Sequence, residues 1–309
     1  MPPDAPSEIA ASADPHESRW RLHEGDAIVP GRTVLRLLGG GLRYEAYLAW
    51  DDRLQSLVVV KIVRPALVHD ERTLAGLAAE VEMLARLSHP VLVRSFAAQI
   101  DGPRPHVVLE HLEGPRLSTL LRRYGALPHE QLVPLGIQLC AAAHYLASEA
   151  VVHLDIKPSN IIMGAPARLI DLSVALTADA CAVLRSPVGT DAYMAPEQCR
   201  PRDGVPVGAP ADVWGIGVTL YEAAAGRRPF RKGDRDAGDP AARWPQLTDA
   251  PAPLDGDVPP ALAEPIMACL ARDPAERPEP AVLLSRLEGV LDALPKPWLS
   301  KLKPRPGRR

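Results

Sequence analysis

The chain has 309 residues, 47% of them hydrophobic, and a formal net charge of −3 at pH 7. No apolar run approaches the roughly 20 residues that a membrane-spanning helix needs, so the sequence predicts a soluble globular protein with no transmembrane segment. The nearly balanced charge argues against nucleic-acid binding by the chain as a whole. The four cysteines are widely spaced. Their spacing fits neither a zinc site nor a disulfide framework and favours a reducing, cytoplasmic setting.

The N-terminal part of the chain is expected to form a small antiparallel sheet with one helix. Three short β-type runs separated by turn residues predict consecutive strands over 33–38, 45–50 and 57–63. Residues 74–87 place apolar side chains at helical spacing and end before a His-Pro pair, which predicts a helix. The run VVLEHL at 107–112 predicts the last strand.

Beyond residue 115 the spacing of apolar residues becomes helical. We expect helices over 131–149, 212–225, 262–270 and 281–294. The second of these is apolar nearly all round, which indicates a helix buried inside its domain. Residues 233–260 are rich in Pro, Asp and Gly and predict a long surface excursion.

The most informative segment is VVHLDIKPSNIIM, which begins at Val151, together with RLIDLSVA shortly after it. It holds two carboxylates, an amide and a lysine, each beside apolar residues that would fix it on a short loop. Asp155 could accept a proton from an attacking hydroxyl, and Lys157 could neutralise phosphate charge. Asn160 and Asp171 offer the hard oxygen ligands that Mg²⁺ prefers. The pattern therefore predicts chemistry on a phosphate and its metal.

These residues carry a resemblance to a known family. HLDIKPSN resembles the catalytic loop of protein kinases, and IDLS resembles their metal-binding segment. The spacing of Asp155 and Lys157 is similar to that of the serine/threonine-specific branch. The preference for Arg over Lys and the abundance of Ala and Pro favour a bacterial-type member of it. The resemblance covers roughly Pro30 to Leu291. It implies an α+β, two-lobed kinase-like fold, with a small antiparallel-sheet N-lobe that carries one main helix and a larger, mostly helical C-lobe.

The resemblance and the composition together predict four regions. Residues 1–27 are interpreted as a disordered arm because they carry few large apolar groups. The N-lobe is expected over 28–112 and the C-lobe over 113–293. Residues 294–309 form a basic, Pro-rich tail that we interpret as solvated, with contact to an anionic membrane surface as the alternative.

The segment LLGGGLRYEAY resembles the kinase glycine-rich loop, whose backbone covers the nucleotide phosphates. Gly39 and Gly41 match the first two glycine positions. Tyr44 stands at the third, where a bulky side chain lies beside the phosphates, and Ala46 replaces a residue that is usually valine. An ordinary glycine-rich hairpin turn is the alternative interpretation of this segment.

The resemblance also implies residues that hold ATP. Lys61, in VVVKIV, corresponds to the lysine that contacts the phosphates and pairs with a helix glutamate. Glu80 has the matching position, with Glu82 as competitor; a surface-facing lysine and a solvated glutamate are the alternatives. The segment from Glu110 to Leu112 resembles the hinge whose backbone binds adenine.

The segment GTDAYMAPEQ resembles the end of the kinase activation segment, which docks peptides. Small-molecule kinases lack it, so the sequence disfavours that function. By resemblance, Thr190 would hydrogen-bond near the catalytic loop and Glu197 would form a buried ion pair with Arg277. Asp212 is placed near the start of the buried helix.

Besides Tyr44 and Ala46, three positions in the catalytic loop and the metal-binding segment depart from the family pattern. Leu154 replaces an arginine that usually meets a phosphate on the activation segment, so switching by phosphorylation is not expected to follow the usual route. Leu172 keeps an apolar side chain in place of Phe, and Ser173 replaces Gly. Thr177 and Ser186 are candidate phosphorylation sites.

The resemblance implies an ATP- and Mg²⁺-dependent kinase acting on Ser/Thr hydroxyls of proteins, including itself through self-association. In that function Asp155 is the base, Lys157 steadies the γ-phosphate, and Asn160 and Asp171 hold Mg²⁺. The alternative is a pseudokinase, a nucleotide-binding module without transfer activity, which the unusual glycine loop and Ser173 motivate.

Overall fold

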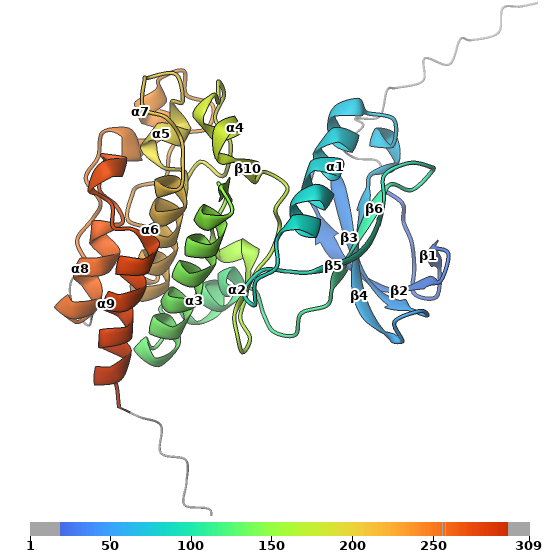
Figure 1. Cartoon of the computed structure of the whole chain (residues 1–309), viewed down its shortest axis with the longest axis horizontal. Helices are drawn as coiled ribbons and strands as arrows, with labels where there is room; N and C mark the ends of the chain where they lie inside the picture. The colour runs from blue at the N-terminus through green and yellow to red at the C-terminus, as the bar shows by residue number, and fades with distance from the viewer. Residues whose placement is uncertain (1–18, 255, 257, 296–309) are drawn as a thin grey trace, which may run out of the picture. The chain divides into compact units, whose positions relative to one another are not determined.

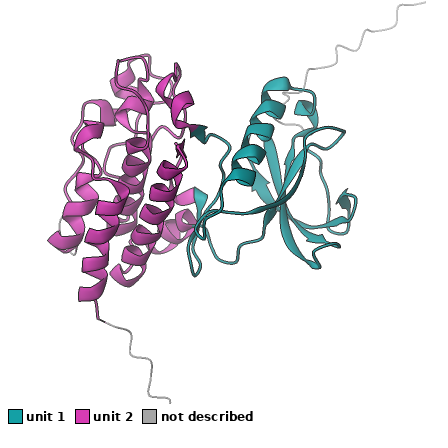
Figure 2. Cartoon of the chain, viewed as in Figure 1, with its two compact units in different colours: residues 1–116, 160–176 teal, residues 117–159, 177–309 magenta. Residues whose placement is uncertain are grey.

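The computed structural model describes residues 19–254, 256 and 258–295. They form two compact units (Figure 2): unit 1 contains residues up to 116 together with 160–176, and unit 2 contains 117–159 and the residues from 177 onward. Unit 1 holds an antiparallel sheet and unit 2 is mostly helical, as the resemblance implied. Unit 1 also takes in residues beyond the predicted limit of the N-lobe.

Unit 1 is built on a six-stranded sheet in which every neighbouring pair is antiparallel, in the order β1-β2-β3-β4-β6-β5. The predicted meander is confirmed, whereas the two edge strands β1 and β5 were not predicted. The six strands are β1 (Ala27–Val29), β2 (Arg32–Gly40), β3 (Tyr44–Asp51), β4 (Ser56–Val63), β5 (Ser95–Gln99) and β6 (His106–Glu110).

The remaining elements of unit 1 are short except for one helix. Helix α1 (Glu71–Arg86) packs against β5 and β6 (Figure 1). A 3-10 turn at Pro65–Leu67 precedes it. A small hairpin consists of β8 (Ile161–Ile162) and β9 (Arg168–Leu169).

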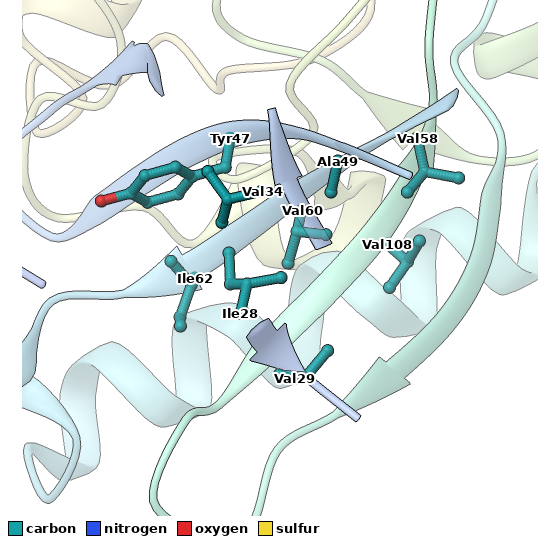
Figure 3. Close-up of a cluster of buried hydrophobic side chains, with 9 residues drawn as sticks. All are labelled: Ile28, Val29, Val34, Tyr47, Ala49, Val58, Val60, Ile62 and Val108. Atoms are coloured by element: carbon teal, nitrogen blue, oxygen red, sulfur yellow. The ribbon is translucent and has the colours of Figure 1, made fainter. Parts of the chain in front are cut away.

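The alternation of side chains along the strands gives the sheet two different faces. On β4, Val58, Val60 and Ile62 are fully buried in a hydrophobic cluster, whereas Val59 and Lys61 lie on the opposite face. Figure 3 shows the side chains of the cluster. Its members come from the neighbouring strands β1, β2, β3, β4 and β6. They are Ile28, Val29, Val34, Tyr47, Ala49, Val58, Val60, Ile62 and Val108.

The chain before β1 packs onto this cluster through Trp20. The indole Nε1 of Trp20 donates to the carbonyl of Val63 at 2.8 Å, and the guanidinium of Arg104 lies 4.8 Å from the centre of a Trp20 ring. Arg104 also donates to the carbonyls of Ala27 (2.8 Å) and Ile28 (2.6 Å). A single arginine therefore connects the N-terminal segment, β1 and the loop before β6.

The predicted disordered arm over 1–27 includes residues that pack on unit 1: Trp20 and Leu22 are partly buried against the cluster and Ala27 begins β1, whereas the other residues from 19 to 26 are exposed. Trp20 supplies the apolar surface that the composition of this segment otherwise lacks. Residues 1–18, and the part of the basic tail from 296 to 309, lie outside the described residues.

Unit 2 contains the helices α2 (Leu117–Tyr124), α3 (His129–Ser148), α4 (Ala178–Ala182), α5 (Pro196–Cys199), α6 (Pro210–Ala225), α7 (Pro240–Arg243), α8 (Pro260–Ala268) and α9 (Pro280–Ala293). The four predicted helices correspond to α3, α6, α8 and α9, while α2 and the short helices were not predicted. Unit 2 also has the strand β7 (Val151–Val152), and β10 (Leu176–Thr177) lies where the chain passes between units. No helix in the described part of the chain has the length and apolarity needed to cross a membrane.

The core of unit 2 lies around α6, which packs against α3 and α8 (Figure 1). Nearly every α6 side chain is buried, as its uniformly apolar sequence predicts. Gly226, with φ 67°, ends the helix in the left-handed conformation that glycine adopts without strain. Helix α9 packs along α3, where a side chain at Gly136 would collide with Leu287.

The segment 233–260 was predicted to be a surface excursion, and its middle part contradicts this prediction. Trp244 and Gln246 are buried, and Trp244 packs in a cluster with Met194 and Cys199. The turn-forming composition correctly indicated irregular backbone, but two buried side chains anchor that backbone to unit 2.

We predict that Trp20→Ala lowers the free energy of unfolding by about 2 kcal/mol, because it removes a half-buried aromatic side chain and its hydrogen bond. Urea unfolding of the wild-type and variant proteins measures the change. Trp50→Ala is the matched control, because Trp50 is 36% exposed on β3 and should cost less. Equal losses in the two variants would contradict a specific role for the N-terminal segment.

Candidate active site

Unit 1 contains a pocket of about 700 Å³ on the face of the sheet opposite the hydrophobic cluster. It brings together predicted residues that are far apart in the sequence. The predicted residues on its lining are Gly39, Gly41, Tyr44, Ala46, Lys61, Glu80, Glu110, Leu112, Asn160, Asp171 and Ser173. Arg36 and Arg116 also line the pocket and were not predicted.

Lys61 is the charged centre of this pocket. Its Nζ donates to both carboxylate oxygens of Glu80 at 2.8 Å and to Oδ1 of Asp171 at 3.0 Å. Burial alone would lower the pKa of Lys61, but the two carboxylates reverse this effect and raise it. The lysine is therefore charged and directed into the pocket. The alternative partner, Glu82, is exposed on α1.

Asp171 has a backbone conformation that is uncommon for residues other than glycine. Its backbone has φ 72°, in the left-handed region. Burial would raise the pKa of Asp171, but the nearby Lys61 ammonium lowers it to about 2. Asp171 is therefore an ionised carboxylate across the physiological range. Ser173 lies outside the left-handed region, so its side chain adds no backbone strain there.

The pocket fits the Mg²⁺ ion that the resemblance implies. An ionised Asp171 and the amide of Asn160 line the same cavity and offer oxygen ligands. The described residues contain no cluster of three His, Cys, Asp or Glu side chains that could hold a metal on its own. Mg²⁺ usually keeps few protein ligands and completes its coordination with phosphate oxygens and water, which suits a site of this kind.

The glycine-rich loop is a hairpin between β2 and β3. The amide of Gly41 donates to the carbonyl of Tyr44 at 3.0 Å and closes the turn. A side chain at Gly40 would lie 2.6 Å from that carbonyl. Glycine is therefore required at a position that the resemblance to the kinase glycine-rich loop did not single out. Gly39 has φ 139°, whereas a side chain at Gly41 would meet open space.

Tyr44 connects this hairpin to helix α1. Its hydroxyl donates to the carbonyl of Thr73 at 3.2 Å, and its ring centre lies 4.8 Å from Nζ of Lys61. The sequence indicated only a bulky replacement for glycine. The observed contacts show that the ring covers the lysine and reaches the first turn of the helix that carries Glu80.

A buried arginine that the sequence did not single out supports the hairpin. Arg64 is 5% exposed, and its Nε donates to the carbonyl of Gly41 at 2.8 Å. A guanidinium nitrogen of Arg64 lies 3.6 Å from the buried carboxylate of Glu45, which accepts from the hydroxyl of Tyr47 at 2.5 Å. The sequence offered one signal for this contact: Glu45 and Arg64 are charged residues beside apolar β-type runs, and a charge that becomes buried requires a partner.

The side chain of Glu110 is already engaged and cannot serve the pocket. Its carboxylate pairs with Arg168 and with Arg94, and it accepts from the Arg94 amide at 2.7 Å. Arg168 also donates to the carbonyl of Leu92 at 2.9 Å. The resemblance assigns the binding of adenine to the backbone of this segment, and the side chain of Glu110 has other partners. The network fixes β6 to β9.

In unit 2, Asp155 and Lys157 of the predicted catalytic loop form a closed triangle of hydrogen bonds with Thr190 of the predicted activation segment. Lys157 Nζ donates to Oδ2 of Asp155 at 2.6 Å and to Oγ1 of Thr190 at 2.5 Å. Thr190 in turn donates to Oδ1 of Asp155 at 2.7 Å. The contacts expected for Thr190 are present, and they fix the orientation of the Asp155 carboxylate.

The backbone beside Asp155 is held by Asp212 at the start of α6. The buried Asp212 carboxylate accepts from the amides of His153 and Leu154, each at 2.8 Å. Leu154 has φ 65°, an unusual conformation for leucine. Gln198 donates to its carbonyl at 3.0 Å. Leu154 itself is buried at 4% exposure, so the position that usually carries arginine is part of the core.

The ion pair expected between Glu197 and Arg277 is present and buried. Arg277 donates through Nη1 and Nη2 to the two carboxylate oxygens, at 2.6 and 2.8 Å. The side chains are 0% and 2% exposed. Of the candidate phosphorylation sites, Thr177 caps α4 by accepting from the Ala180 amide at 3.3 Å, and Ser186 is exposed.

We predict that Lys61→Met lowers the free energy of unfolding by about 3 kcal/mol, because the buried Glu80 carboxylate loses its partner. The double variant Lys61→Met/Glu80→Gln should recover part of this loss, since no unpaired charge then remains. Urea unfolding of the single and double variants measures the coupling. Strictly additive losses would show that the two side chains do not interact. Lys232→Met, at an exposed lysine, is the control.

Two substitutions of Tyr44 are expected to affect the affinity for Mg-ATP differently. We predict that Tyr44→Phe leaves the affinity for Mg-ATP within about twofold, because the ring over Lys61 remains, whereas Tyr44→Ala weakens it by about fivefold. Titration with a fluorescent ATP analogue measures both. Tighter binding by the alanine variant would instead mean that the ring obstructs the phosphates.

Comparison with known proteins places the chain in a family. The family model described as "Protein kinase domain" matches residues 32–287. Serine/threonine-protein kinase PknA of Mycobacterium tuberculosis (strain H37Rv) is 31% identical over 253 residues, which cover 78% of this chain and 57% of the relative. Probable serine/threonine-protein kinase PkwA of Thermomonospora curvata is 33% identical over 288 residues, with 91% and 37% covered.

Serine/threonine-protein kinase PknB of Mycobacterium leprae is 32% identical over 203 residues, which cover 63% of this chain and 32% of the relative. The chain therefore matches from about a third to somewhat more than half of the length of these three relatives. The family match covers both the glycine hairpin and the Asp155 loop. The chain belongs to the protein kinase domain family, and the relatives it matches are bacterial serine/threonine-protein kinases.

Proposed function

We propose that the protein transfers the γ-phosphate of ATP to Ser or Thr hydroxyls of protein substrates, in a Mg²⁺-dependent reaction. The observation that carries this proposal is the position of Lys61, whose ammonium is held by Glu80 and Asp171 inside a pocket with the glycine hairpin and Asn160. A buried ammonium with two carboxylate partners adds little net stability, because desolvation offsets the attraction, so its place in a pocket favours a functional role.

Unit 1 supplies the groups that hold ATP. Lys61 binds phosphate oxygens, the hairpin from Gly39 to Gly41 covers the phosphates with backbone amides, and the backbone from Glu110 to Leu112 binds adenine. Asn160 and Asp171 hold Mg²⁺, which neutralises phosphate charge when it is bound. The ring of Tyr44 limits the movement of Lys61 in the open pocket.

Unit 2 supplies the groups that act on the acceptor. Asp155 takes the proton from the Ser or Thr hydroxyl as its oxygen forms a bond to the γ-phosphorus. The bond between that phosphorus and the β–γ bridging oxygen breaks, and ADP leaves. Lys157 neutralises charge that develops on the transferred group, and Thr190 keeps the Asp155 carboxylate in orientation.

The acceptor proteins include the chain itself, which would associate with a second copy to be phosphorylated. The activation-segment resemblance around Thr190 supports protein acceptors over small molecules, because that segment provides a surface for a peptide. Ser186 is exposed and Thr177 is half-buried, so Ser186 is the more accessible of the two candidate acceptors.

We predict that Asp155→Asn reduces phosphate transfer by about 10²- to 10⁴-fold, because the amide cannot accept the hydroxyl proton. Transfer from γ-labelled ATP with Mg²⁺ to the chain itself and to a generic basic protein measures the loss. Asp179→Asn is the matched control, since Asp179 is exposed on α4. ATP binding without transfer by the wild-type protein would contradict the proposal and establish the pseudokinase alternative.

A further inference from the structure

Unit 2 contains a second, smaller pocket that no part of the proposed ATP site uses. Its volume is about 350 Å³. Five cationic side chains and one carboxylate, Asp191, are among its lining residues. The cationic residues are Arg228, Arg231, Lys232, Arg235 and Arg243.

The negative charge of Asp191 is already neutralised within the pocket. Its carboxylate accepts from Arg243 at 3.2 and 3.3 Å and from the Trp244 indole at 3.0 Å, and Arg235 lies 3.8 Å away. Arg231 pairs with Asp249 at 2.9 Å. Among the residues that line the pocket, the single carboxylate of Asp191 does not balance the five cationic side chains.

Two of the cations are available for a ligand. Arg228 and Lys232 are both exposed, and neither forms an ion pair with a described residue. A small cavity with several cations at its edge attracts an anion, and arginine provides several donors for a carboxylate or phosphate. The volume suits a single acidic or phosphorylated side chain.

The floor of this pocket is rigid, which lowers the entropic cost of binding. The buried amide of Gln246 donates to the carbonyls of Asp191 at 2.7 Å and Met194 at 3.1 Å. The guanidinium of Arg243 lies 4.4 Å from the centre of a Trp244 ring. The segment around Trp244 thus fixes the predicted activation segment at Asp191 and Met194 and places cationic side chains beside it.

Thr190 places the pocket next to the proposed acceptor position. Thr190 is one of its lining residues, and the same Thr190 Oγ1 donates to Asp155 at 2.7 Å and accepts from Lys157 at 2.5 Å. An extended peptide advances by about 3.5 Å per residue, so a side chain one to three positions from the acceptor can reach a pocket that begins here.

We propose that this basic pocket selects protein substrates that carry an acidic or already phosphorylated side chain one to three residues from the phosphorylated Ser or Thr. This inference rests on the proposed function, since it assigns a substrate class to the same reaction. Arg228 and Lys232 are the specificity-determining residues, and the anion replaces solvent at their charged groups. A substrate with a basic side chain at that position is disfavoured by the same cations.

Peptide phosphorylation tests the proposal. Peptides share one Ser acceptor and carry Asp, phosphoserine, Ala or Lys at each neighbouring position in turn. At the best position, kcat/KM for the Asp and phosphoserine peptides should exceed that for the Ala peptide by about tenfold or more, and the Lys peptide should fall below Ala. Comparing Asp with phosphoserine tells whether the pocket takes a carboxylate or a phosphoryl group.

The double variant Arg228→Glu/Lys232→Glu should abolish this preference and favour the Lys peptide. Arg122→Glu/Arg286→Glu is the matched control, because both of its arginines are exposed, lie in unit 2 and do not line the pocket. Self-phosphorylation in the same samples confirms that the variants are active. A wild-type protein with equal kcat/KM for all four peptides, or a pocket variant with unchanged preference, would overturn the proposal.

A binding measurement tests the pocket independently of the proposed transfer activity. Fluorescence anisotropy with a labelled phosphoserine peptide and the Asp155→Asn protein requires no turnover. We expect the pocket variant to bind about tenfold more weakly than the control variant, with the difference reduced at high salt. If no variant or wild type transfers phosphate but this difference remains, the transfer function fails and the anion pocket stands. Equal binding by the pocket variant and the control variant would show that the basic pocket does not bind the anionic side chain.

Discussion

A charged lysine buried on one face of a β-sheet is the constraint on which the rest of unit 1 depends. Lys61 lies in the middle of an apolar strand, where an unpaired ammonium would cost several kcal/mol. Its charge is stable there because Glu80 comes from α1 and Asp171 from the segment that follows the β8–β9 hairpin. The two ion pairs therefore form only when α1, β4 and the segment after β9 are correctly placed relative to one another.

The glycine hairpin depends on the same arrangement. Tyr44 spans from the hairpin to Thr73 on α1, and its ring lies over Lys61. Arg64 donates a hydrogen bond to the carbonyl of Gly41 in the same hairpin. A loop that must approach phosphates closely gains from such supports, because preorganised donors need no rearrangement when charge develops. The tyrosine that departs from the family pattern is thus part of the structure that holds the lysine.

Unit 2 has a comparable reliance on buried polar contacts around a strained backbone. Asp212 accepts two backbone amides beside Asp155, and one of them belongs to Leu154 in its left-handed conformation. Strained residues persist at functional sites where surrounding contacts fix them. Here those contacts come from Asp212 and Gln198.

Features with a local signal could be predicted from the sequence. Alternating apolar residues gave β2 to β4, helical spacing gave α3, α6, α8 and α9, and the short polar motif gave Asp155, Asn160 and Asp171. Features that depend on distant partners could not be predicted. Trp20 packs near Arg104, and Trp244 anchors a segment rich in Pro and Gly, because of contacts that the local composition does not encode. The need for glycine at Gly40 likewise arises only once the carbonyl of Tyr44 is placed beside it.

Calorimetric titration of Mg²⁺ and ATP into the wild-type and Lys61→Met proteins tests most directly the claim that the Lys61 cluster is built to hold phosphate. The account predicts Mg²⁺-dependent binding by the wild type and binding at least about tenfold weaker by the variant. Circular dichroism of the same samples establishes that the variant is folded. A folded Lys61→Met protein that binds Mg-ATP as tightly as the wild type would contradict the account.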